Sequence, residues 1–386
     1  MEWKEVRLGD IADVQTGPFG SQLHKSDYIA EGIPCIMPTN IGSHLNFIVD
    51  GIAHVSEVDA NRLSRHLTEF GDIIYARRGD IEKCAYVTTN EEKWLCGTGC
   101  LKIRCNNGVN SRFIAYQLST AECKKWITGN AVGTTMLNLS KGILSNLPLL
   151  VPSHEDQRRI ASILSSLDRK IELNNKINAD LEEMAQAIFK NWFVDFEPFK
   201  DGKFVDSELG MIPEGWKVGC LGDIAEITSG KRPPKKSKDK TKELFIPLIG
   251  ASDIMGFTSD VLYERPILVI GRVGTHGVVQ RFQEKCWPSD NTLVIESSYY
   301  NYVYQLLKGI DYSAINRGST QPLITQTDVK NTDVIIAPEN VLKEYESITS
   351  TLFSKHRANI KENSRLSTLR DTLLPRLMSG ELEVPE

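Results

Sequence analysis

The sequence lacks the long apolar runs that cross a membrane. No stretch approaches the roughly 20 consecutive apolar residues of a transmembrane helix, and the longest runs, such as 266–270, have the length of a strand. The first ten residues contain no basic segment followed by an apolar one, so we expect no signal peptide. The 386 residues are 41% hydrophobic and 25% charged, which argues against wholesale disorder. We therefore expect a cytoplasmic, globular protein of two or three domains.

Cysteine is also scarce, with eight residues in the chain, and we expect these thiols to be reduced. Cys96, Cys100 and Cys105 lie close together in the sequence. Their spacing contains no C-x-x-C pair, and no second pair completes a zinc site. We interpret them as buried thiols of a strand and predict no metal site.

Signatures of catalysis are absent as well. The segment GNAVGTT at 129–135 lacks the lysine of a phosphate-binding loop, and no G-x-G-x-x-G follows a strand. Neither the G-x-S-x-G turn of hydrolases nor the H-E-x-x-H of zinc proteases occurs. The Asn-Pro-Pro-aromatic tetrapeptide of amino-methylating enzymes is missing too, and DFEP at 195–198 does not replace it. These absences predict a chain that is not an enzyme and binds no cofactor of its own.

The overall charge gives little support for a nucleic-acid binder, because 45 basic residues face 50 acidic ones and the net charge is -5. Local charge can overrule this total. The segment KRPPKKSKDKTK at 231–242 carries seven basic residues and one acidic residue, and such a loop can neutralise phosphates. Its first four basic residues are candidate DNA contacts: Lys231, Arg232, Lys235 and Lys236. The alternative is a solvated loop without a ligand.

The chain contains an internal repeat. Residues 3–12 and 216–225 are identical at seven of ten positions. Two weaker similarities follow in the same order, between 71–79 and 266–274 and between 133–140 and 318–325. Between these landmarks the two copies differ almost completely. We interpret the repeat as a duplicated framework that carries two divergent surfaces, and the alternative is a duplication in which one copy has lost its function.

Each copy combines a globular part with a helical part. The globular parts consist of short β-rich runs, interrupted by brief helical patterns at 111–119 and 300–308. The sequence therefore predicts an α+β fold with two similar globular domains and two long helices. The predicted order is globular domain 1 at 1–152, long helix 1 at 153–197, a linker at 198–213, globular domain 2 at 214–338 and long helix 2 at 339–386.

The two helices carry apolar residues at intervals of three and four, the pattern of a coiled-coil seam. The seam includes Met184 in the first helix and Ile348 and Leu369 in the second. Each seam turns polar at its middle, with Asn174, Asn175 and Asn178 in the first helix and His356, Asn359 and Asn363 in the second. We expect the helices to pair antiparallel, with the polar residues facing each other and a domain at each end. The alternative is that each helix docks separately on its own domain.

Arginine recurs at one landmark of the repeat. Arg77 with Gly79 and Arg272 with Gly274 each follow a buried strand, and glycine permits a turn that holds the arginine at a loop tip. Arginine reads bases and binds phosphates, so both are candidate DNA contacts. The alternative is a surface arginine on a turn. Weaker candidates are other polar loop residues, namely Arg78, Thr134, Thr135, His276, Arg317, Thr320 and Gln321, together with Asn40, His44 and Arg281.

Four passages resemble the specificity subunit of type I restriction–modification enzymes. They are the repeated W-K-x-x-x-L-G-D-I-A opening, LPLLVPSHEDQRRIASILSSLDRKIELNN at 147–175, AIFKNWFVDFEPF at 187–199 and RLSTLRDTLLPRLMSGELEV at 365–384. The similarity covers essentially the whole chain. One segment departs from it, because VLKEYESITSTLF at 341–353 lacks the Glu-Gln-Arg-Ile style of start that is present at 155–160.

The resemblance implies that 1–152 and 214–338 are target-recognition domains 1 and 2 and that 153–197 and 339–386 are spacer helices 1 and 2. It implies that each domain reads one half of a bipartite, asymmetric site in double-stranded DNA. It implies that the helices set the spacing of the half-sites and dock two modification subunits, which bind S-adenosylmethionine and methylate adenine. A separate restriction subunit uses ATP and Mg²⁺ to translocate and cut DNA. The alternative function is a structural adaptor that bridges two protein partners and does not touch DNA.

Overall fold

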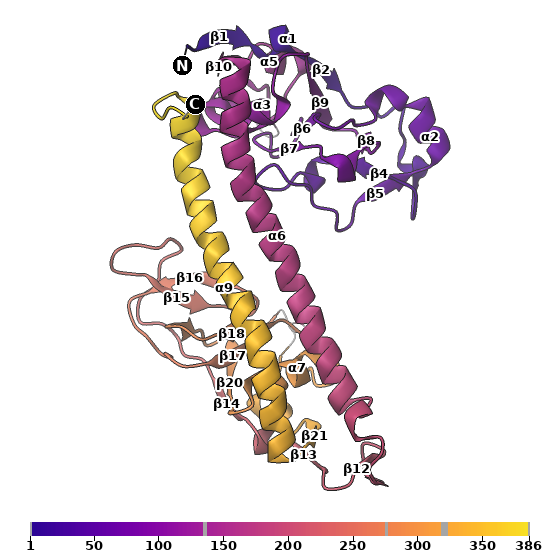
Figure 1. The fold of residues 1–386 in the computed structure, drawn as a ribbon, viewed down its shortest axis with the longest axis vertical. Helices are drawn as coiled ribbons and strands as arrows, with labels where there is room; N and C mark the ends of the chain where they lie inside the picture. The colour runs from indigo at the N-terminus through magenta and orange to yellow at the C-terminus, as the bar shows by residue number, and fades with distance from the viewer. Residues whose placement is uncertain (1, 134–136, 275–276, 318–322, 385–386) are drawn as a thin grey trace. The chain divides into compact units, whose positions relative to one another are not determined.

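The computed structural model describes residues 2–133, 137–274, 277–317 and 323–384. The chain divides into two compact units. Unit 1 comprises Met1–Asn174 and Lys361–Glu386, and unit 2 comprises Asn175–Ile360. Two helices of 40 residues, α6 (His154–Phe193) and α9 (Glu339–Met378), each contribute one half to each unit (Figure 1). The two long helices predicted from the apolar periodicity are therefore confirmed.

Unit 1 is built on a four-stranded antiparallel sheet in the order β2-β9-β6-β7. These strands are β2 (Ala12–Thr16), β9 (Cys100–Cys105), β6 (Ile73–Ala76) and β7 (Cys84–Tyr86). A second sheet has the order β3-β5-β4-β8, with β3 (Tyr28–Ile29), β5 (Ala53–Val55), β4 (Ile33–Ile36) and β8 (Leu95–Cys96). A separate pair joins β1 (Lys4–Arg7) to β10 (Pro148–Val151). The shorter helices are α1 (Leu8–Ile11), α2 (Glu57–Arg62), α3 (Ser111–Leu118), α4 (Ala121–Asn130) and α5 (Lys141–Ser145).

Unit 2 repeats this plan in a reduced form. Its main sheet has the order β14-β20-β17-β18, with β14 (Glu226–Ser229), β20 (Thr292–Glu296), β17 (Ile267–Gly271) and β18 (Val279–Phe282). Its second sheet has the order β16-β15-β19, with β16 (Ile254–Thr258), β15 (Ile246–Ile249) and β19 (Trp287–Pro288). The remaining elements are the pair β13 (Lys217–Cys220) and β21 (Asp333–Ile336), the pair β11 (Phe204–Val205) and β12 (Ile212–Pro213), and the helices α7 (Tyr300–Gly309) and α8 (Gln326–Lys330). The predicted α+β fold with two similar domains is confirmed.

The central strand of each main sheet is buried on both faces. In β6, Ile73 and Tyr75 lie in the core that contains α3 and α6, whereas Ile74 and Ala76 face a smaller core between the two sheets. In β17, alternate residues separate into two cores in the same way. A strand that buries both faces reads as a continuous apolar run, which is why both strands stood out in the sequence.

Within each unit, the segments of α6 and α9 lie side by side and run antiparallel. In unit 1, Nδ2 of Asn174 donates a hydrogen bond to Oδ1 of Asn363 at 2.8 Å. In unit 2, Nδ2 of Asn359 donates to Oδ1 of Asn178 at 2.9 Å, and His356 lies 4.0 Å from a carboxylate oxygen of Glu182. The prediction that the polar middles of the two helices face each other is therefore confirmed.

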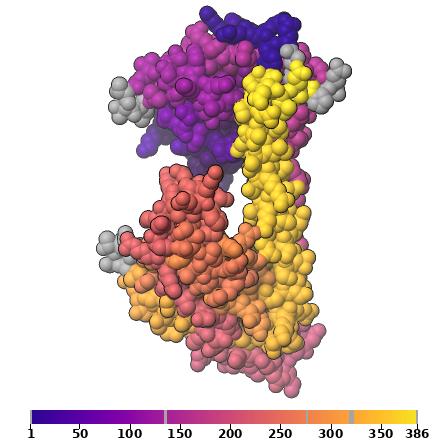
Figure 2. Space-filling view, turned by 90° about the vertical axis from the view of Figure 1, so that its left-hand side faces the viewer, coloured from indigo at the N-terminus to yellow at the C-terminus, as the bar shows by residue number. Residues whose placement is uncertain are grey.

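Part of the predicted apolar seam is wrong. Met184, Ile348 and Leu369 are exposed, and their neighbours Ala185, Thr349 and Arg370 are buried in their place. An α-helix drifts relative to a strict repeat of 3.5 residues, so a seam extended over many turns moves off the buried face. The exposed side chains lie on helix faces that remain open to solvent, and the open face of α9 is visible in Figure 2.

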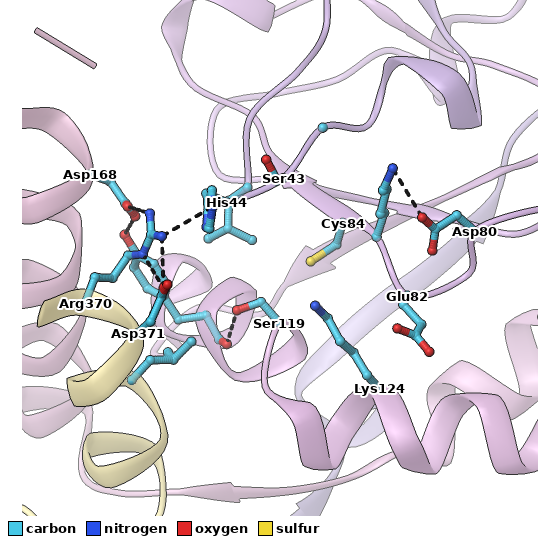
Figure 3. Close-up of a pocket in the computed structure, with 15 residues that line it drawn as sticks. Ser43, His44, Asp80, Glu82, Cys84, Ser119, Lys124, Asp168, Arg370 and Asp371 are labelled. Atoms are coloured by element: carbon cyan, nitrogen blue, oxygen red, sulfur yellow. Dashed lines mark hydrogen bonds and ion pairs between the residues drawn. The ribbon is translucent and has the colours of Figure 1, made fainter. Parts of the chain in front are cut away.

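A buried arginine of α9 joins three segments of unit 1 (Figure 3). Nη1 of Arg370 donates to Oδ1 of Asp168 on α6 at 2.8 Å, and Nη2 lies 3.3 Å from Nε2 of His44. The hydroxyl of Tyr116, on α3, donates to Oδ2 of Asp168 at 2.5 Å. These four residues line a cavity of about 300 Å³. His44, a weaker candidate for base reading, therefore has an internal partner where the globular part of unit 1 meets the long helices.

The segment predicted as a linker, 198–213, packs within unit 2. It contains β11 and β12, and Ile212 is buried. Phe199 meets the ring of Trp216 edge to face, with ring centroids 5.0 Å apart. Trp216 also packs against Phe193 at the end of α6. These aromatic contacts pack the Pro- and Gly-rich segment against the core of unit 2.

The cysteines of unit 1 serve packing. Cys96 and Cys100 are fully buried between the two sheets, and burial raises the pKa of the Cys96 thiol to about 12. The thiol of Cys100 donates to the carbonyl oxygen of Ile36 at 3.4 Å. Among the described residues, no group of three His, Cys, Asp or Glu side chains is placed to hold a metal ion. In the same part of the chain, no helix has the length and apolarity that a membrane span requires.

Candidate nucleic-acid interface

One edge of the main sheet in unit 1 collects the ends of three strands. β2 and β6 each pair antiparallel with β9, so β2 and β6 end where β9 begins. At this edge the backbone N–H of Gly17 donates to the carbonyl of Cys100 at 2.9 Å, and the N–H of Arg77 donates to the carbonyl of Gly99 at 2.8 Å. Arg77 is therefore held beside the loop that follows β2.

Val132, Asn138 and Leu139 are tied to one another and to the same edge by backbone hydrogen bonds. The backbone N–H of Val132 donates to the carbonyl of Asn138 at 3.2 Å, and the N–H of Asn138 donates to the carbonyl of Val132 at 2.9 Å. The next residue, Leu139, donates from its backbone N–H to the carbonyl of Arg77 at 2.9 Å. The predicted contacts Thr134 and Thr135 follow Val132 in the sequence and lie outside the described residues.

Unit 2 repeats most of these backbone hydrogen bonds at the equivalent positions. The N–H of Gly230 donates to the carbonyl of Thr292 at 3.0 Å, and the N–H of Arg272 donates to the carbonyl of Asn291 at 2.8 Å. The N–H of Ile324 donates to the carbonyl of Arg272 at 3.0 Å, as Leu139 does to Arg77. The N–H of Arg317 donates to the carbonyl of Leu323 at 2.9 Å, and the N–H of Leu323 donates to Oδ1 of Asn316 at 2.8 Å.

Glycine is required where the first loop leaves this edge. A Cβ at Gly17 would lie 2.1 Å from the carbonyl oxygen of Gly97, and a Cβ at Gly230 would lie 2.1 Å from the carbonyl oxygen of Ser289. Real Cβ atoms do not approach a carbonyl oxygen so closely. The two glycines therefore let the backbone of each loop cross the sheet edge at the same place in both units.

The loops that begin at Gly17 and Gly230 carry different kinds of side chain. In unit 2, the loop begins with the exposed residues Lys231 and Arg232 and continues to the exposed Lys235 and Lys236. Its backbone is anchored twice: Nε1 of Trp287 donates to the carbonyl of Lys231 at 2.7 Å, and two hydrogen bonds of 2.9 and 2.8 Å join Ser237 to Phe257. The basic loop is therefore fixed to the sheets at both ends and presents its charges to solvent.

In unit 1, the corresponding loop presents an aromatic side chain. Phe19 is 51% exposed, and the guanidinium of Arg77 lies 5.8 Å from the centre of its ring. Aromatic side chains stack on bases or wedge between them in many nucleic-acid complexes. Sequence reasoning missed Phe19. Its signal was its position two residues after Gly17, just beyond the strand that follows the repeated segment 3–12.

The sheet edges bring together most of the predicted contacts that the structure describes. Arg77 and Arg78 lie at the edge of unit 1, and Arg78 is exposed and forms a β-bridge with Asn138. Arg272 and the basic loop lie at the edge of unit 2. Arg317 is also there, and its guanidinium pairs with Asp328 at the first turn of α8. His276, Thr320 and Gln321 lie outside the described residues.

Two of the weaker candidates are structural instead. Nδ2 of Asn40 donates to the carbonyl of Ile48 at 3.1 Å, and Asn40 is buried. The guanidinium of Arg281 lies 3.4 Å from the ring centre of Phe353 and donates to Oδ1 of Asn301 at 2.6 Å. Burial lowers the pKa of Arg281. The expectation that these two side chains read bases is wrong, because tertiary packing encloses both of them.

Comparison with known proteins identifies the family of this chain. The family described as the type I restriction modification DNA specificity domain matches residues 1–183 and 213–365. The type I restriction enzyme MjaIX specificity subunit of Methanocaldococcus jannaschii is 30% identical over 414 residues, covering 100% of this chain and 94% of that protein. The HindI specificity subunit of Haemophilus influenzae is 24% identical and covers 99% of this chain and 100% of its own length.

A solved structure shares the fold. The S subunit of a type I restriction–modification system from M. genitalium superposes with a TM-score of 0.65 at 16% identity, over 98% of this chain and 96% of that one. The sequence resemblance predicted this relationship, and the comparisons confirm it along the whole chain. This protein belongs to the family of type I restriction–modification DNA specificity subunits.

Proposed function

We propose that this chain selects the DNA sequence on which a type I restriction–modification complex acts. Each unit reads one half of a bipartite, asymmetric site through the loops at its sheet edge. The observation that supports this most is the combination of one repeated backbone frame with loops of different sequence. A shared frame presents the loops in the same way, and different loops contact different base edges.

The proposed contacts come from the loops at these two edges. Recognition is assigned to residues 1–152 and 214–338. The DNA contacts in unit 1 are Arg77, Arg78, Thr134 and Thr135. Those in unit 2 are Lys231, Arg232, Lys235, Lys236, Arg272, His276, Arg317, Thr320 and Gln321. The basic loop adds affinity that does not depend on sequence, because it neutralises phosphates and releases counterions.

The helices are proposed to set the spacing of the half-sites and to dock two modification subunits. α6 and α9 keep apolar side chains exposed to solvent, including Leu173 at 52%, Ile360 at 51% and Leu369 at 46%. Exposed apolar side chains that gather on a surface mark sites for protein partners. The two docking faces differ, because the first turns of α6 carry Arg158 and Arg159 where α9 has no such pair.

The chemistry belongs to the partners in this proposal. The modification subunits bind S-adenosylmethionine and methylate adenine, and the restriction subunit uses ATP and Mg²⁺. This chain contributes recognition and positioning and carries out no catalytic step. The sequence supports this division, because the motifs that bind phosphates or methylate amino groups are missing from it.

The alternative, an adaptor that bridges two proteins without DNA, is not favoured by the family to which the chain belongs. Salt dependence separates the two functions. The complex of this chain with its modification subunit should bind a duplex that contains the recognised site, and binding should weaken steeply between 50 and 200 mM salt, by about 10³-fold if six phosphates are contacted. Binding to protein partners that tolerates salt, with no binding to any duplex, would support the adaptor.

A further inference from the structure

Arg77 and Arg272 occupy the same place in the two units. Each directly follows the central strand of its sheet, and each is joined to two neighbouring segments by the backbone hydrogen bonds described above. Two residues later the chain turns through a glycine in the left-handed region, Gly79 with φ 76° and Gly274 with φ 84°. A residue with a Cβ is strained in that region, so the turn depends on glycine.

The side chains of these arginines are also alike. Both are partly buried, and in both the Nε–H is fully buried and meets no hydrogen-bond acceptor among the described residues. A buried donor without an acceptor costs about 1–3 kcal/mol. The unpartnered Nε–H therefore costs free energy at the equivalent arginine of both units, although the neighbouring loops differ in sequence. This coincidence indicates that the same partly buried guanidinium is maintained in both units for a shared role.

The charge of both arginines is available for a ligand. Other arginines of the two domains form ion pairs with carboxylates of the same protein. Arg104 pairs with Asp72 and Glu69, Arg265 pairs with Glu296, and Arg317 pairs with Asp328. No ion pair joins Arg77 or Arg272 to a carboxylate within the described ranges. A planar guanidinium with free donors fits the oxygens of a phosphate.

The repeat itself shows what such a ligand contributes. Two units that read different half-sites need different residues for the bases that differ. An arginine that is the same in both units, on the same backbone frame, cannot make that distinction. Phosphates are the part of DNA that every sequence shares, and contacts with them fix the register of a protein on the duplex.

We infer that Arg77 and Arg272 are equivalent phosphate anchors. Each holds a DNA backbone phosphate at its own half-site and so sets the register in which the neighbouring loops meet the bases. This inference rests on the proposed function and assigns one role within it. Arg78 provides the contrast, because its counterpart in unit 2 is Val273. Arg78 belongs to one unit and is therefore free to read a base.

The test uses the complex of the full chain with its modification subunit and duplexes with and without the recognised site. Arg77→Gln and Arg272→Gln are each expected to weaken binding to both duplexes by the same factor, about tenfold at 0.1 M salt. The slope of log affinity against log salt should become shallower by about 0.9 for each variant. Arg77→Lys, which keeps the charge, should recover most of the slope. The methylated motif should stay unchanged in both arginine-to-glutamine variants.

Other results would overturn the assignment. A motif that loses a base preference in Arg77→Gln or Arg272→Gln would make these residues base readers, and an unchanged salt slope would remove the phosphate contact. Arg78→Gln serves as the matched control, and it should relax the motif in one half-site. Retention of the wild-type slope by Arg77→Lys shows that the domain is folded. If the wild-type complex bound no duplex at all, the proposed function itself would fail, and this assignment would fail with it.

Discussion

In unit 2, the side-chain nitrogen of Asn359 on α9 donates a hydrogen bond to the side-chain oxygen of Asn178 on α6, at 2.9 Å. The two residues are 1% and 8% exposed, so each depends on the other for a partner. Unit 1 has a similar contact between Asn174 and Asn363. A buried polar pair in an apolar seam fixes the register of two helices at some cost in stability.

Replacing Asn359 by leucine should destabilise unit 2 by about 1–3 kcal/mol, because the buried amide of Asn178 loses its partner. Replacing both asparagines by leucine should recover most of this loss, since no unpaired polar group remains. Urea unfolding measures both effects. Ala358→Leu, at an exposed position beside Asn359, is the control and should change little. A double variant no more stable than Asn359→Leu would contradict this account.

Arg370→Met should destabilise unit 1 by about 3 kcal/mol. The change leaves the carboxylate of Asp168, which is 17% exposed, without its cation, although Tyr116 still donates to it. Hydrogen exchange of the amides in α3 should report the loss. Arg376→Met removes a cation from the same helix at an exposed ion pair with Glu381 and should cost less than about 1 kcal/mol. Equal losses of stability in the two variants would show that the buried contacts of Arg370 stabilise unit 1 no more than an exposed ion pair does.

The basic loop of unit 2 should supply affinity without specificity. The test is joint replacement of Lys231, Arg232, Lys235 and Lys236 by alanine. The slope of log affinity against log salt should become shallower by about 0.9 for each phosphate contact that is lost. The recognised motif should not change, because phosphate contacts carry no sequence information. Binding is measured on the complex with its modification subunit over a series of salt concentrations. A changed motif with an unchanged slope would refute the assignment.

Acid should weaken unit 1 through His66. Burial, together with the neighbouring positive charges of Arg65 and Lys102, lowers the pKa of His66 to about 4. The folded-state pKa lies below the unfolded value of about 6.5, so the unfolded chain takes up the proton first as the pH falls. This contribution to stability is complete above about pH 6.5 and decreases by about 3 kcal/mol as the pH falls to 4.

His66→Gln lacks this titration and provides the comparison. The difference in urea midpoint of unit 1 between the wild type and His66→Gln should vary between pH 6.5 and 4, with the wild type losing more stability toward acid. Above pH 7 the difference should be constant. Parallel curves over the acidic range would show that His66 does not contribute.

The elements that the sequence predicted best are those with local signals. The helix that begins at His154 follows Pro152, and the helix that begins at Glu339 follows Pro338, because proline and a change of periodicity mark both starts. Cys100 and Cys105 were expected to lie in a strand, and both lie in β9. Elements with weak local signals were missed. The second sheet of unit 1 consists of strands of two to four residues, whose pairing depends on partners far along the chain.

The candidate interface was predicted where the repeat marked it. Arg77 and Arg272 could be found because the same residue follows the same strand in both copies. The hydrogen bonds that bring Leu139 to Arg77 and Ile324 to Arg272 are tertiary, and no sequence pattern contains them. Arg281 was misjudged for the same reason, since the ring of Phe353 that covers it lies 72 positions away in a different element.

The central claim is that this chain decides which DNA sequence its complex modifies. The most direct measurement is methylome sequencing of a host free of DNA methylation that expresses the chain together with the modification subunit from its own genome. The account predicts adenine methylation at one bipartite, asymmetric motif, and no methylation when this chain is left out. If the modification subunit is expressed and co-purifies with the chain but no motif is methylated, the claim is contradicted.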